Sequence, residues 1–379
     1  MLRRPVLLLS VVATVTVPGV LTVFAIIGHE HAIAPSMARA SATAPLNPSP
    51  AADGAPAADA DGTAVALEPG SQARVQGLQM LLRAAEAGHA SSYQGVEVIK
   101  DTTVAGESAV TATVWHRQGD QAVVQVSDGQ SYNSGVSGDR DPQGVFGVTT
   151  TFVELLAKHY TVEYQGASSA LGRAALIVAV RRADGSLAAR FWLDAQTMLP
   201  LRKDVYDTTA RLVTDDRFVS VRFGTTAMPR ASAAPGQVSW SQAPSPATLL
   251  KKLGCPVPGT LPGDMNLYDA SQEATSNGQV TDFGFSDGLS VMSLFVQRGT
   301  LPAKMPGWRT ATISGHEVYV TNQEIVLAGQ GFVYTFIADA PPQTVDAAVS
   351  DVASSSQPGV LGRMGRGFGR IVSVLDPFN

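Results

Sequence analysis

A pentapeptide in the C-terminal half of the chain has the spacing of a nucleophilic serine. Gly284-Phe285-Ser286-Asp287-Gly288 matches the Gly-x-Ser-x-Gly pattern, in which a serine on a sharp turn attacks a carbonyl carbon. That chemistry needs a strand before the serine and a helix after it. Here an Asp-Gly turn leads into the strand-like run Leu289 to Val296. The sequence therefore favours a β-hairpin over a nucleophile elbow.

Other reactive residue types are sparse and are not paired for catalysis. Cys255 stands in Gly254-Cys255-Pro256 without a nearby histidine to activate it, so we expect a free thiol. His29-Glu30-His31 is interpreted as a solvated segment, with a metal site as the alternative. Asp215-Asp216 and Asp139-Arg140-Asp141 are interpreted as loop charges, because they lack the flanking ligands of a calcium loop. We expect no enzymatic activity, no metal and no cofactor. The sequence puts no ionisable group in an obvious apolar pocket, so it nominates no site of perturbed pKa.

Composition narrows the class of protein further. The chain has 379 residues, which allows two or three domains, and 45% of them are hydrophobic. Its net charge of −5 argues against a general nucleic-acid binder, which would carry a basic domain. A single cysteine excludes an intramolecular disulfide. We therefore expect a globular protein that is held together by its apolar cores.

The N-terminus predicts export. Arg3 and Arg4 precede an uncharged run, residues 5–27, that is long enough to span a bilayer. Residues 1–4 would then be a cytoplasmic stub, because positive charges stay inside. A cleaved signal peptide is the alternative, since Ala38-Arg39-Ala40 offers a small-residue cleavage pattern. The protein is expected to be a single-pass cell-membrane protein with extracytoplasmic domains, or secreted or periplasmic if the segment is cleaved.

Composition shifts divide the rest of the chain. Residues 28–70 are rich in Ala and Pro and are predicted to be a tether. Residues 71–227 form a larger predicted domain, the Pro/Ala/Ser-rich residues 228–246 a linker, and residues 247–353 a smaller domain. Each domain combines helices with antiparallel strands, which is typical of an α+β fold and not of parallel βαβ units. Residues 354–379 form a basic tail.

Periodicity predicts the elements of each domain. Apolar residues at three- and four-residue spacing predict helices, and alternation between turn signals predicts strands. The predicted helices are 71–88, 150–160, a short one around 249–250 and one including 345–352. The predicted strands are 93–99, 110–116, 121–126, 175–180, 189–193, 199–206, 217–223, 283–285, 289–296, 310–313, 318–320, 325–327 and 332–337.

The tail has the pattern of an amphipathic helix. Arg363, Arg366 and Arg370 lie opposite an apolar face that includes Phe368. Such a helix suits an anionic membrane surface, so these four residues are predicted membrane contacts. Packing on the smaller domain and a lack of fixed structure are the alternatives, because interspersed glycines oppose the helix.

Three motifs, in order across residues 71–353, carry a family resemblance. They are Ala189-Arg190-Phe191-Trp192-Leu193-Asp194 followed by Met198 to Asp204, then Phe285-Ser286-Asp287-Gly288-Leu289-Ser290 leading into Val291 to Val296, and finally Val318-Tyr319-Val320 through Phe332 to Pro342. They resemble motifs of the sigma-E regulatory RseB/MucB family of bacterial envelopes. The first motif is similar to a strand–turn–strand of the family's larger domain. The second and third are similar to a hairpin, and to a closing strand with its helix, in the family's smaller domain.

The resemblance implies both a fold and a function. The larger domain of the family is LolA-like, which means that it is similar to lipoprotein carriers. It is a half-open antiparallel β-barrel with packed helices and an apolar cavity. A smaller α+β C-terminal domain follows. Family members hold a membrane anti-sigma factor and shield it from proteolysis, and a lipid or misfolded protein in the cavity releases that hold. The implied function is therefore control of an extracytoplasmic stress response. The alternative is a lipid or lipoprotein carrier of the envelope. The predicted N-terminal anchor and the Arg-rich tail depart from the soluble periplasmic pattern.

Strand alternation nominates residues for these roles, because side chains two apart share a face of a strand. Trp192 alternates with Phe191 and is expected on the other side of the sheet. With Arg202, Asp287 and Gly288 it is predicted to contact a partner or the other domain. Strand alternation also nominates residues that would line the apolar cavity; the alternative is that they simply form the core face of the sheet. The residues predicted to line the apolar cavity are Val96, Val98, Val110, Val114, Val124, Val126, Phe191 and Leu193.

Overall fold

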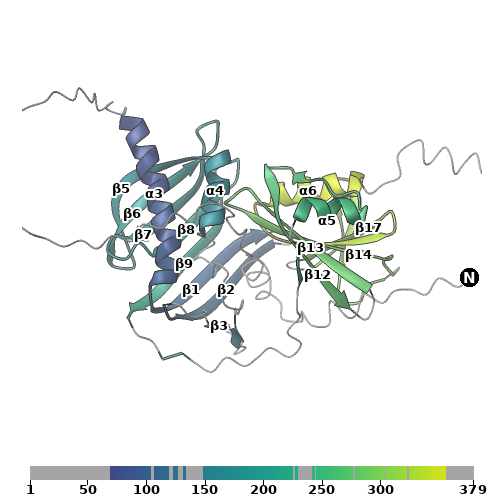
Figure 1. Cartoon of the computed structure of the whole chain (residues 1–379), viewed down its shortest axis with the longest axis horizontal. Coiled ribbons are helices and arrows are strands. Elements are labelled where there is room, and N and C mark those ends of the chain that lie inside the picture. The colour runs from purple at the N-terminus through teal and green to yellow at the C-terminus, as the bar shows by residue number, and fades with distance from the viewer. Residues whose placement is uncertain are drawn as a thin grey trace, which may run out of the picture.

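The chain folds into two antiparallel sheets that lie next to each other, each with helices on one face (Figure 1). The computed structural model describes residues 69–103, 106–118, 123–126, 131–133, 148–224, 227–228, 241–243, 245–275, 278–302, 304–321 and 324–355. We call the first sheet, β1 to β9, the N-terminal sheet and the second, β10 to β18, the C-terminal sheet.

The N-terminal sheet runs in the order β4-β3-β2-β1-β9-β8-β7-β6-β5, so that β4 and β5 are its two edges and the curled sheet stays open. Two helices accompany it, α3 (Pro69–Ala90) and α4 (Thr150–His159). Its strands are β1 (Tyr93–Thr103), β2 (Gly106–His116), β3 (Val123–Val126), β4 (Ser131–Asn133), β5 (Thr161–Ala170), β6 (Arg173–Arg181), β7 (Leu187–Asp194), β8 (Pro200–Tyr206) and β9 (Leu212–Phe223).

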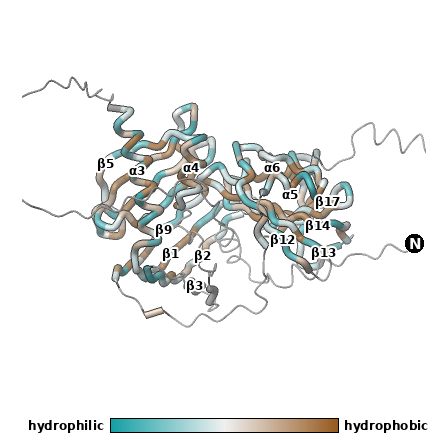
Figure 2. The backbone as a smooth tube through the Cα atoms, viewed as in Figure 1, coloured by the Kyte–Doolittle hydropathy of each residue, from teal (hydrophilic) through white to brown (hydrophobic). Residues whose placement is uncertain are grey.

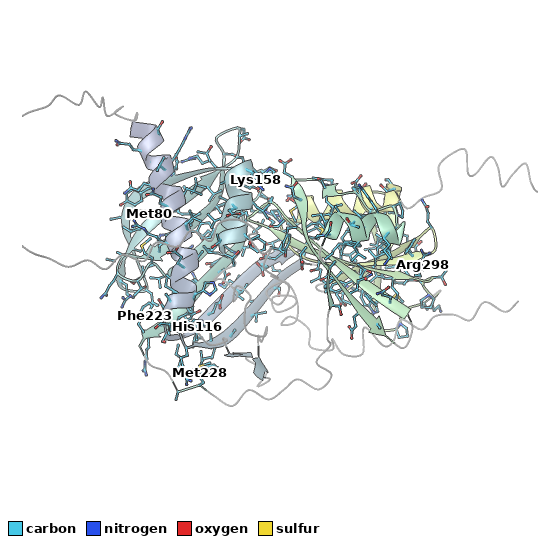
Figure 3. The ribbon with its side chains drawn as sticks, in the orientation of Figure 1. Met80, His116, Lys158, Phe223, Met228 and Arg298 are labelled. Atoms are coloured by element: carbon cyan, nitrogen blue, oxygen red, sulfur yellow. The ribbon has the colours of Figure 1, made fainter. Side chains whose placement is uncertain are left out.

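The inner face of the N-terminal sheet is the face that α3 and α4 cover. Leu81 of α3 and Leu156 of α4 pack with Phe191 and Leu193 of β7 in one buried cluster. Figure 3 shows Met80 midway along α3, with His116 and Phe223 near its lower end. Thr149 begins α4 by accepting a hydrogen bond from the Phe152 N–H at 3.2 Å, because the first helical N–H groups lack partners inside the helix. A second cluster continues along the inner face through Tyr93, Ala112, Val114, Leu199, Leu201 and Phe218.

The C-terminal sheet runs in the order β10-β12-β13-β14-β18-β17-β16-β15, and β11 also pairs with β12. Its helices are α5 (Pro246–Leu253) and α6 (Pro342–Ser355). Its strands are β10 (Ser241–Gln242), β11 (Thr260–Leu261), β12 (Met265–Thr275), β13 (Gly278–Ser286), β14 (Val291–Arg298), β15 (Arg309–Ile313), β16 (His316–Val320), β17 (Glu324–Gly329) and β18 (Phe332–Asp339).

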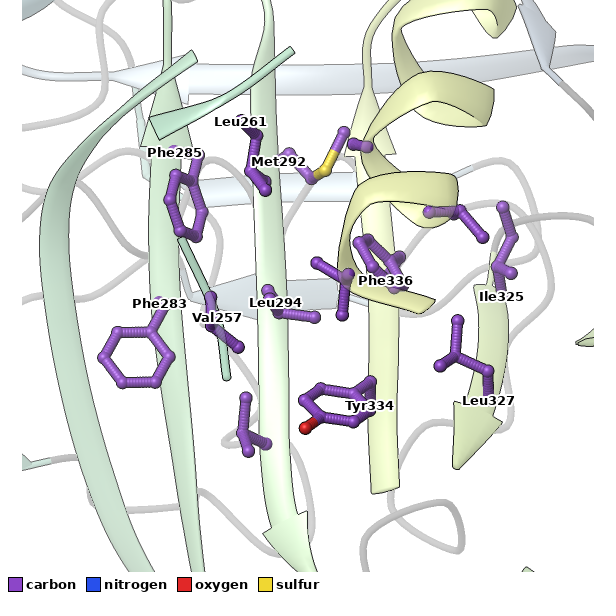
Figure 4. Packing of buried hydrophobic residues seen from close by; sticks show 14 of the residues in the cluster. Val257, Leu261, Phe283, Phe285, Met292, Leu294, Ile325, Leu327, Tyr334 and Phe336 are labelled. Carbon is purple, nitrogen blue, oxygen red and sulfur yellow. The ribbon is translucent and has the colours of Figure 1, made fainter. Parts of the chain in front are cut away.

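The core of the C-terminal sheet lies between the strands and the two helices. Phe283, Leu294 and Phe336 come from three neighbouring strands and are almost fully buried (Figure 4). Hydrophobic residues, brown in Figure 2, follow strands such as β14 and β17. The α6 residues in this core are Val345, Ala348, Val349, Val352 and Ala353. Each fully buried large side chain contributes about 1.5–3 kcal/mol through removal of apolar surface from water.

The described residues confirm the expected α+β class, with a half-open sheet, packed helices and a second α+β unit. Two long strands, β5 and β12, were not predicted. β10 pairs with β12, so residues 241–242 of the predicted linker belong to the C-terminal sheet. No helix among the described residues is long and apolar enough to cross a membrane. Residues 69–70 of the predicted tether belong to α3, and residues 354–355 of the predicted tail belong to α6. Residues 5–27 and the rest of the tether and the tail lie outside the described residues, so their roles stay predictions.

Candidate functional site

A loop of the C-terminal sheet inserts against a helix of the N-terminal sheet. This junction loop, Ser286 to Ser290, connects β13 to β14 in the predicted hairpin, so the serine is not on a strand-to-helix elbow. Gly288 has φ of +91°, and a Cβ there would lie 2.1 Å from the Leu156 backbone nitrogen of α4. The close approach therefore requires glycine. Leu289 enters the core cluster under α3 and α4.

The carboxylate of Asp287 organises this loop. It accepts hydrogen bonds from the N–H groups of Leu289 at 2.8 Å and Ser290 at 2.7 Å, and from the Tyr160 hydroxyl at 2.5 Å. Burial raises the pKa of Asp287, although the three donors favour its charged form. Burial and the neighbouring carboxylate also raise the pKa of Tyr160 above its usual range. The sequence-predicted Asp287 and Gly288 thus lie at the contact between the two sheets.

Further contacts join the two sheets on either side of this loop. The Asn266 amide lies 2.8 Å from Nε2 of His159, and the Gln343 amide donates to Asp207 at 3.3 Å. An apolar group completes the junction, with an edge-to-face pair of Phe152 and Tyr268 at 5.3 Å between ring centroids. Its members are Phe152, Leu155, Tyr268, Val291 and Ile337. Polar and apolar contacts therefore both join the two sheets at this junction.

A group of charged residues, which we call the charged cluster, lies on the inner face of the N-terminal sheet where β18 ends. It consists of Glu97 and Asp101 of β1, Lys203 of β8, Asp216 of β9 and Asp339 of β18. Lys203 lies directly across from Asp216, and its Nζ lies 3.9 Å from Oδ2 of Asp339. Lys203 and Asp216 are only 5% exposed. Strand pairing puts Asp216 across from Ile99, so Glu97 and Asp101, two residues to either side, share that face.

Burial and mutual repulsion shift the titration of the charged cluster. Burial, then the charge of Asp339, raises the pKa of Asp101 to about 7. Burial raises the pKa of Glu97 and of Asp216, and the charge of Glu97 raises that of Asp216 further. Burial disfavours the charge of Lys203, but the surrounding carboxylates, Asp339 first, raise its pKa all the same. The sequence nominated no site of perturbed pKa, so this cluster was not predicted.

Asp215 and Asp216 also correct an expectation. They are not loop charges, because both lie within β9 and alternate between its two faces. Asp216 belongs to the charged cluster, whereas Asp215 forms ion pairs with Arg202 at 3.7 Å and Arg217 at 3.3 Å. A signal for the charged cluster was present in β1, where Glu97 shares strand parity with Tyr93 and Ile99. The pairing of β1 with β9, far apart in sequence, was the missing information.

The predicted cavity residues divide between the two faces of the N-terminal sheet. Val110 and Val114 pair with Ile99 and Gly95 and share the inner face with the buried Phe191 and Leu193 of β7. Val96 and Val98 pair instead with Thr113 and Thr111, so the structure places them on the outer face. The side chains of Val124 and Val126 lie outside the described residues, although their strand pairs with β2. Binding of an apolar ligand by this set stays a prediction.

Trp192 and Arg202 lie together on the outer face. The guanidinium of Arg202 lies 4.6 Å from the ring centroid of Trp192, and that of Arg190 lies 5.8 Å away. Asp204 holds Arg202 by hydrogen bonds of 2.7 and 2.8 Å. Trp192 is half-buried and faces away from Phe191, as strand alternation predicted. We call Arg190, Trp192 and Arg202 the outer patch.

The remaining candidate residues are a cysteine and groups outside the described residues. Cys255 is a buried free thiol, and burial raises its pKa. No group of three or more His, Cys, Asp or Glu side chains among the described residues is arranged to hold a metal ion. His29-Glu30-His31, Asp139-Arg140-Asp141 and the predicted membrane contacts Arg363, Arg366, Phe368 and Arg370 lie outside the described residues.

Comparisons with known proteins give one matching family model and several solved structures. No curated protein matches the chain. A solved MucB in complex with MucA(peri) is 20% identical, covers 72% of this chain and 96% of its own, and has a TM-score of 0.45. A Pseudomonas aeruginosa MucA/MucB complex is 21% identical over 72% of this chain and 96% of its own, with a TM-score of 0.43. A LolA superfamily protein from Nitrosomonas europaea is 10% identical over 70% and 96%, with a TM-score of 0.17.

The family model agrees with the resemblance that the sequence motifs carry. It is described as the MucB/RseB N-terminal domain and matches residues 116–242, from the end of β2 to β10. This region contains the outer patch, Lys203 and Asp216. Over residues 116–242 the chain is therefore similar to the MucB/RseB family, as the sequence motifs indicated.

Proposed function

We propose that this protein is an extracytoplasmic regulator that binds the exported segment of a membrane anti-sigma factor and thereby controls an envelope stress response. The match of residues 116–242 to the MucB/RseB N-terminal domain carries the proposal. A MucB has been solved in complex with MucA(peri), and the motif resemblance implies an anti-sigma factor as the partner class. Residues 5–27 would hold the chain at the membrane where such a partner lies, and the arginines of the tail would contact the same membrane surface.

We assign the partner contact to the outer patch. Its tryptophan is half-buried between two guanidinium groups, and aromatic and arginine side chains are the residue types that dominate binding energy at protein interfaces. Neighbouring strands extend the patch with Arg217, which is ion-paired to Asp215. A partner segment with apolar and acidic side chains would complement this surface.

The junction between the two sheets supports a regulatory mechanism. A regulator needs two states that differ in affinity for the partner, and a ligand that prefers one of them shifts the balance. The junction loop, the Tyr160–Asp287 hydrogen bond and the charged cluster form a contact that is able to open. We propose that a lipid or misfolded protein acts by changing this contact.

Site-specific crosslinking in living cells tests the proposal. A photo-crosslinking residue replaces Trp192 in one tagged full-length chain and Trp308, half-buried before β15, in a matched control. We expect the Trp192 position, and not the Trp308 position, to capture a protein with one transmembrane span that represses a sigma factor. Capture of lipoproteins or lipid-synthesis proteins without such a protein would contradict the regulator and favour the envelope carrier.

A further inference from the structure

The charged cluster has more negative than positive groups. Four carboxyl groups, those of Glu97, Asp101, Asp216 and Asp339, surround the single ammonium group of Lys203. One oxygen of Asp101 and one of Asp216 are buried without a hydrogen-bond partner. Leaving several buried carboxylates ionised around one cation is costly. Protons must therefore supply part of the missing positive charge.

The neighbouring carboxyl groups of Glu97 and Asp216 lead to the same conclusion. Strand register puts both groups on one face, and burial together with their mutual repulsion favours a proton on one of them. Asp101 lies nearer the junction, where it faces Asp339 of the C-terminal sheet. The two sheets thus contribute carboxyl groups to one site, where the buried Lys203 forms an ion pair with the partly exposed Asp339.

We propose that the charged cluster is a proton-controlled latch, which holds the two sheets together while Asp101 and the Glu97–Asp216 pair carry protons and releases them when those protons are lost. The geometry that carries this inference is the strand register, which puts Asp101 on the same face as the buried Lys203, together with the 3.9 Å contact between Lys203 and Asp339 of the other sheet. It does not depend on the proposed partner.

The sign follows from proton linkage. In the closed junction, burial and then Asp339 raise the pKa of Asp101 to about 7. In an open junction water enters and Asp339 moves away, so the pKa of Asp101 falls toward its ordinary value of about 4. The closed state therefore binds one more proton between these two values. The stability that this proton adds to the closed state is complete below about pH 4 and is lost as the pH rises through about 7. For this one proton, the ratio of open to closed molecules rises by at most about tenfold per pH unit.

The other groups that face Asp101 reinforce this direction or leave it unchanged. The raised pKa values of Glu97 and Asp216 add proton uptake of the same sign. Lys203 has a raised pKa and keeps its charge throughout the neutral range. Tyr93, which Glu97 influences, has a raised pKa and stays neutral there. His159 is another titratable group at the junction, beside Asn266, and needs its own control.

Single-molecule energy transfer between the two sheets tests the latch. Cysteines replace the exposed Ala183 and Lys304 in a Cys255→Ala background, and a dye pair labels the full-length chain. We expect the longer-distance population to grow about tenfold or more from about pH 5 to about pH 8. Asp101→Asn, which imitates the protonated group, is expected to reduce this growth. Glu107→Gln, an exposed change in the same hairpin, and His159→Gln are expected to retain it.

Two results would overturn the latch. One is an unchanged distance distribution across this pH range in the parent chain. The other is an equal pH response in Asp101→Asn and in the parent. If Asp101→Asn does not fold, Asp339→Asn serves instead, because it removes the repulsion that raises the pKa of Asp101. The opening midpoint of Asp339→Asn should then lie at lower pH than that of the parent, and an unshifted midpoint would contradict the latch.

Discussion

The Tyr160 hydroxyl donates a 2.5 Å hydrogen bond to the Asp287 carboxylate and so joins two residues that are 127 positions apart in the chain. Tyr160 ends α4 on the N-terminal sheet, and Asp287 lies in the turn of the β13–β14 hairpin. Asp287 has 4% exposure, so water cannot replace the hydroxyl easily. This hydrogen bond therefore helps to fix the position of the C-terminal sheet against α4 of the N-terminal sheet.

Tyr160→Phe tests the energetic value of this hydrogen bond. The change keeps the ring and removes the donor, while two backbone N–H groups still hold Asp287. Because the acceptor is charged and buried, we expect a loss of about 2 kcal/mol in the free energy of unfolding, measured by chemical denaturation. Tyr164→Phe in β5 removes a hydroxyl away from the junction and should change the stability by less than about 0.5 kcal/mol. Equal losses in the two variants would contradict the assigned role of Tyr160.

Gly288→Ala tests the close approach of the junction loop to α4. The new Cβ would lie 2.1 Å from the Leu156 nitrogen and 2.5 Å from the Phe152 carbonyl oxygen, so the loop must move away. We expect faster amide hydrogen exchange in the junction loop and a lower melting temperature, because the loop no longer docks.

Gly185→Ala is a matched control for this change. Gly185 has φ of +83° in the β6–β7 turn, and a Cβ there meets no atom within 4 Å. It therefore carries only the backbone cost of positive φ, about 1–2 kcal/mol. If the two alanine variants were destabilised equally, the loss at Gly288 would be backbone strain and the docking contact would not be its cause.

Trp192→Ala tests the outer patch as the partner contact. Truncation removes the ring between Arg190 and Arg202, and central aromatic anchors contribute more than about 1 kcal/mol to an interface. We expect binding of the anti-sigma segment captured by crosslinking to weaken about tenfold or more, measured by titration calorimetry. Trp308→Ala is the control, with unchanged affinity expected. Unchanged affinity in Trp192→Ala, with a native circular dichroism spectrum, would place the partner on another face.

Strong local patterns were sufficient to predict most elements. β7 and β14 alternate or run as apolar segments between turn signals, and both were predicted nearly to their ends. β5 and β12 were missed because their sequences, TVEYQGASSA and MNLYDASQEAT, offer no sustained apolar alternation. β5 is held by pairing with β6 and by the packing of α3, and β12 by pairing with β13. Tertiary contacts decide such strands, and a local pattern does not contain them.

The candidate site was predictable only in part, for a similar reason. Asp287 and Gly288 lie in a short motif whose turn chemistry is local, so the motif pointed to them. The charged cluster combines residues of β1, β8, β9 and β18, which come together only through long-range strand pairing. Lys203 appears in the sequence as part of an ordinary alternating strand. Nothing in its neighbours indicates that it meets carboxylates from both sheets.

Lys203→Met tests whether that lysine balances the charged cluster. The change keeps a long side chain and removes the cation that faces Asp101, Asp216 and Asp339. Removing one partner of a buried ion pair costs about 3–5 kcal/mol, because the remaining charge is uncompensated. Here protons can neutralise the carboxylates, whose pKa values are raised already by burial. The penalty should therefore be small at about pH 5 and should grow toward about 3 kcal/mol at about pH 8.

Denaturation of Lys203→Met and of the parent chain at both pH values measures this difference. Lys251→Met, an exposed change in α5, controls for the loss of one positive charge and should show little penalty at either pH. A penalty for Lys203→Met that is equal at both pH values would mean that the lysine acts by packing alone. A penalty that grows with pH would mean that the carboxyl groups around Lys203 lose protons over this range, and the latch depends on that loss.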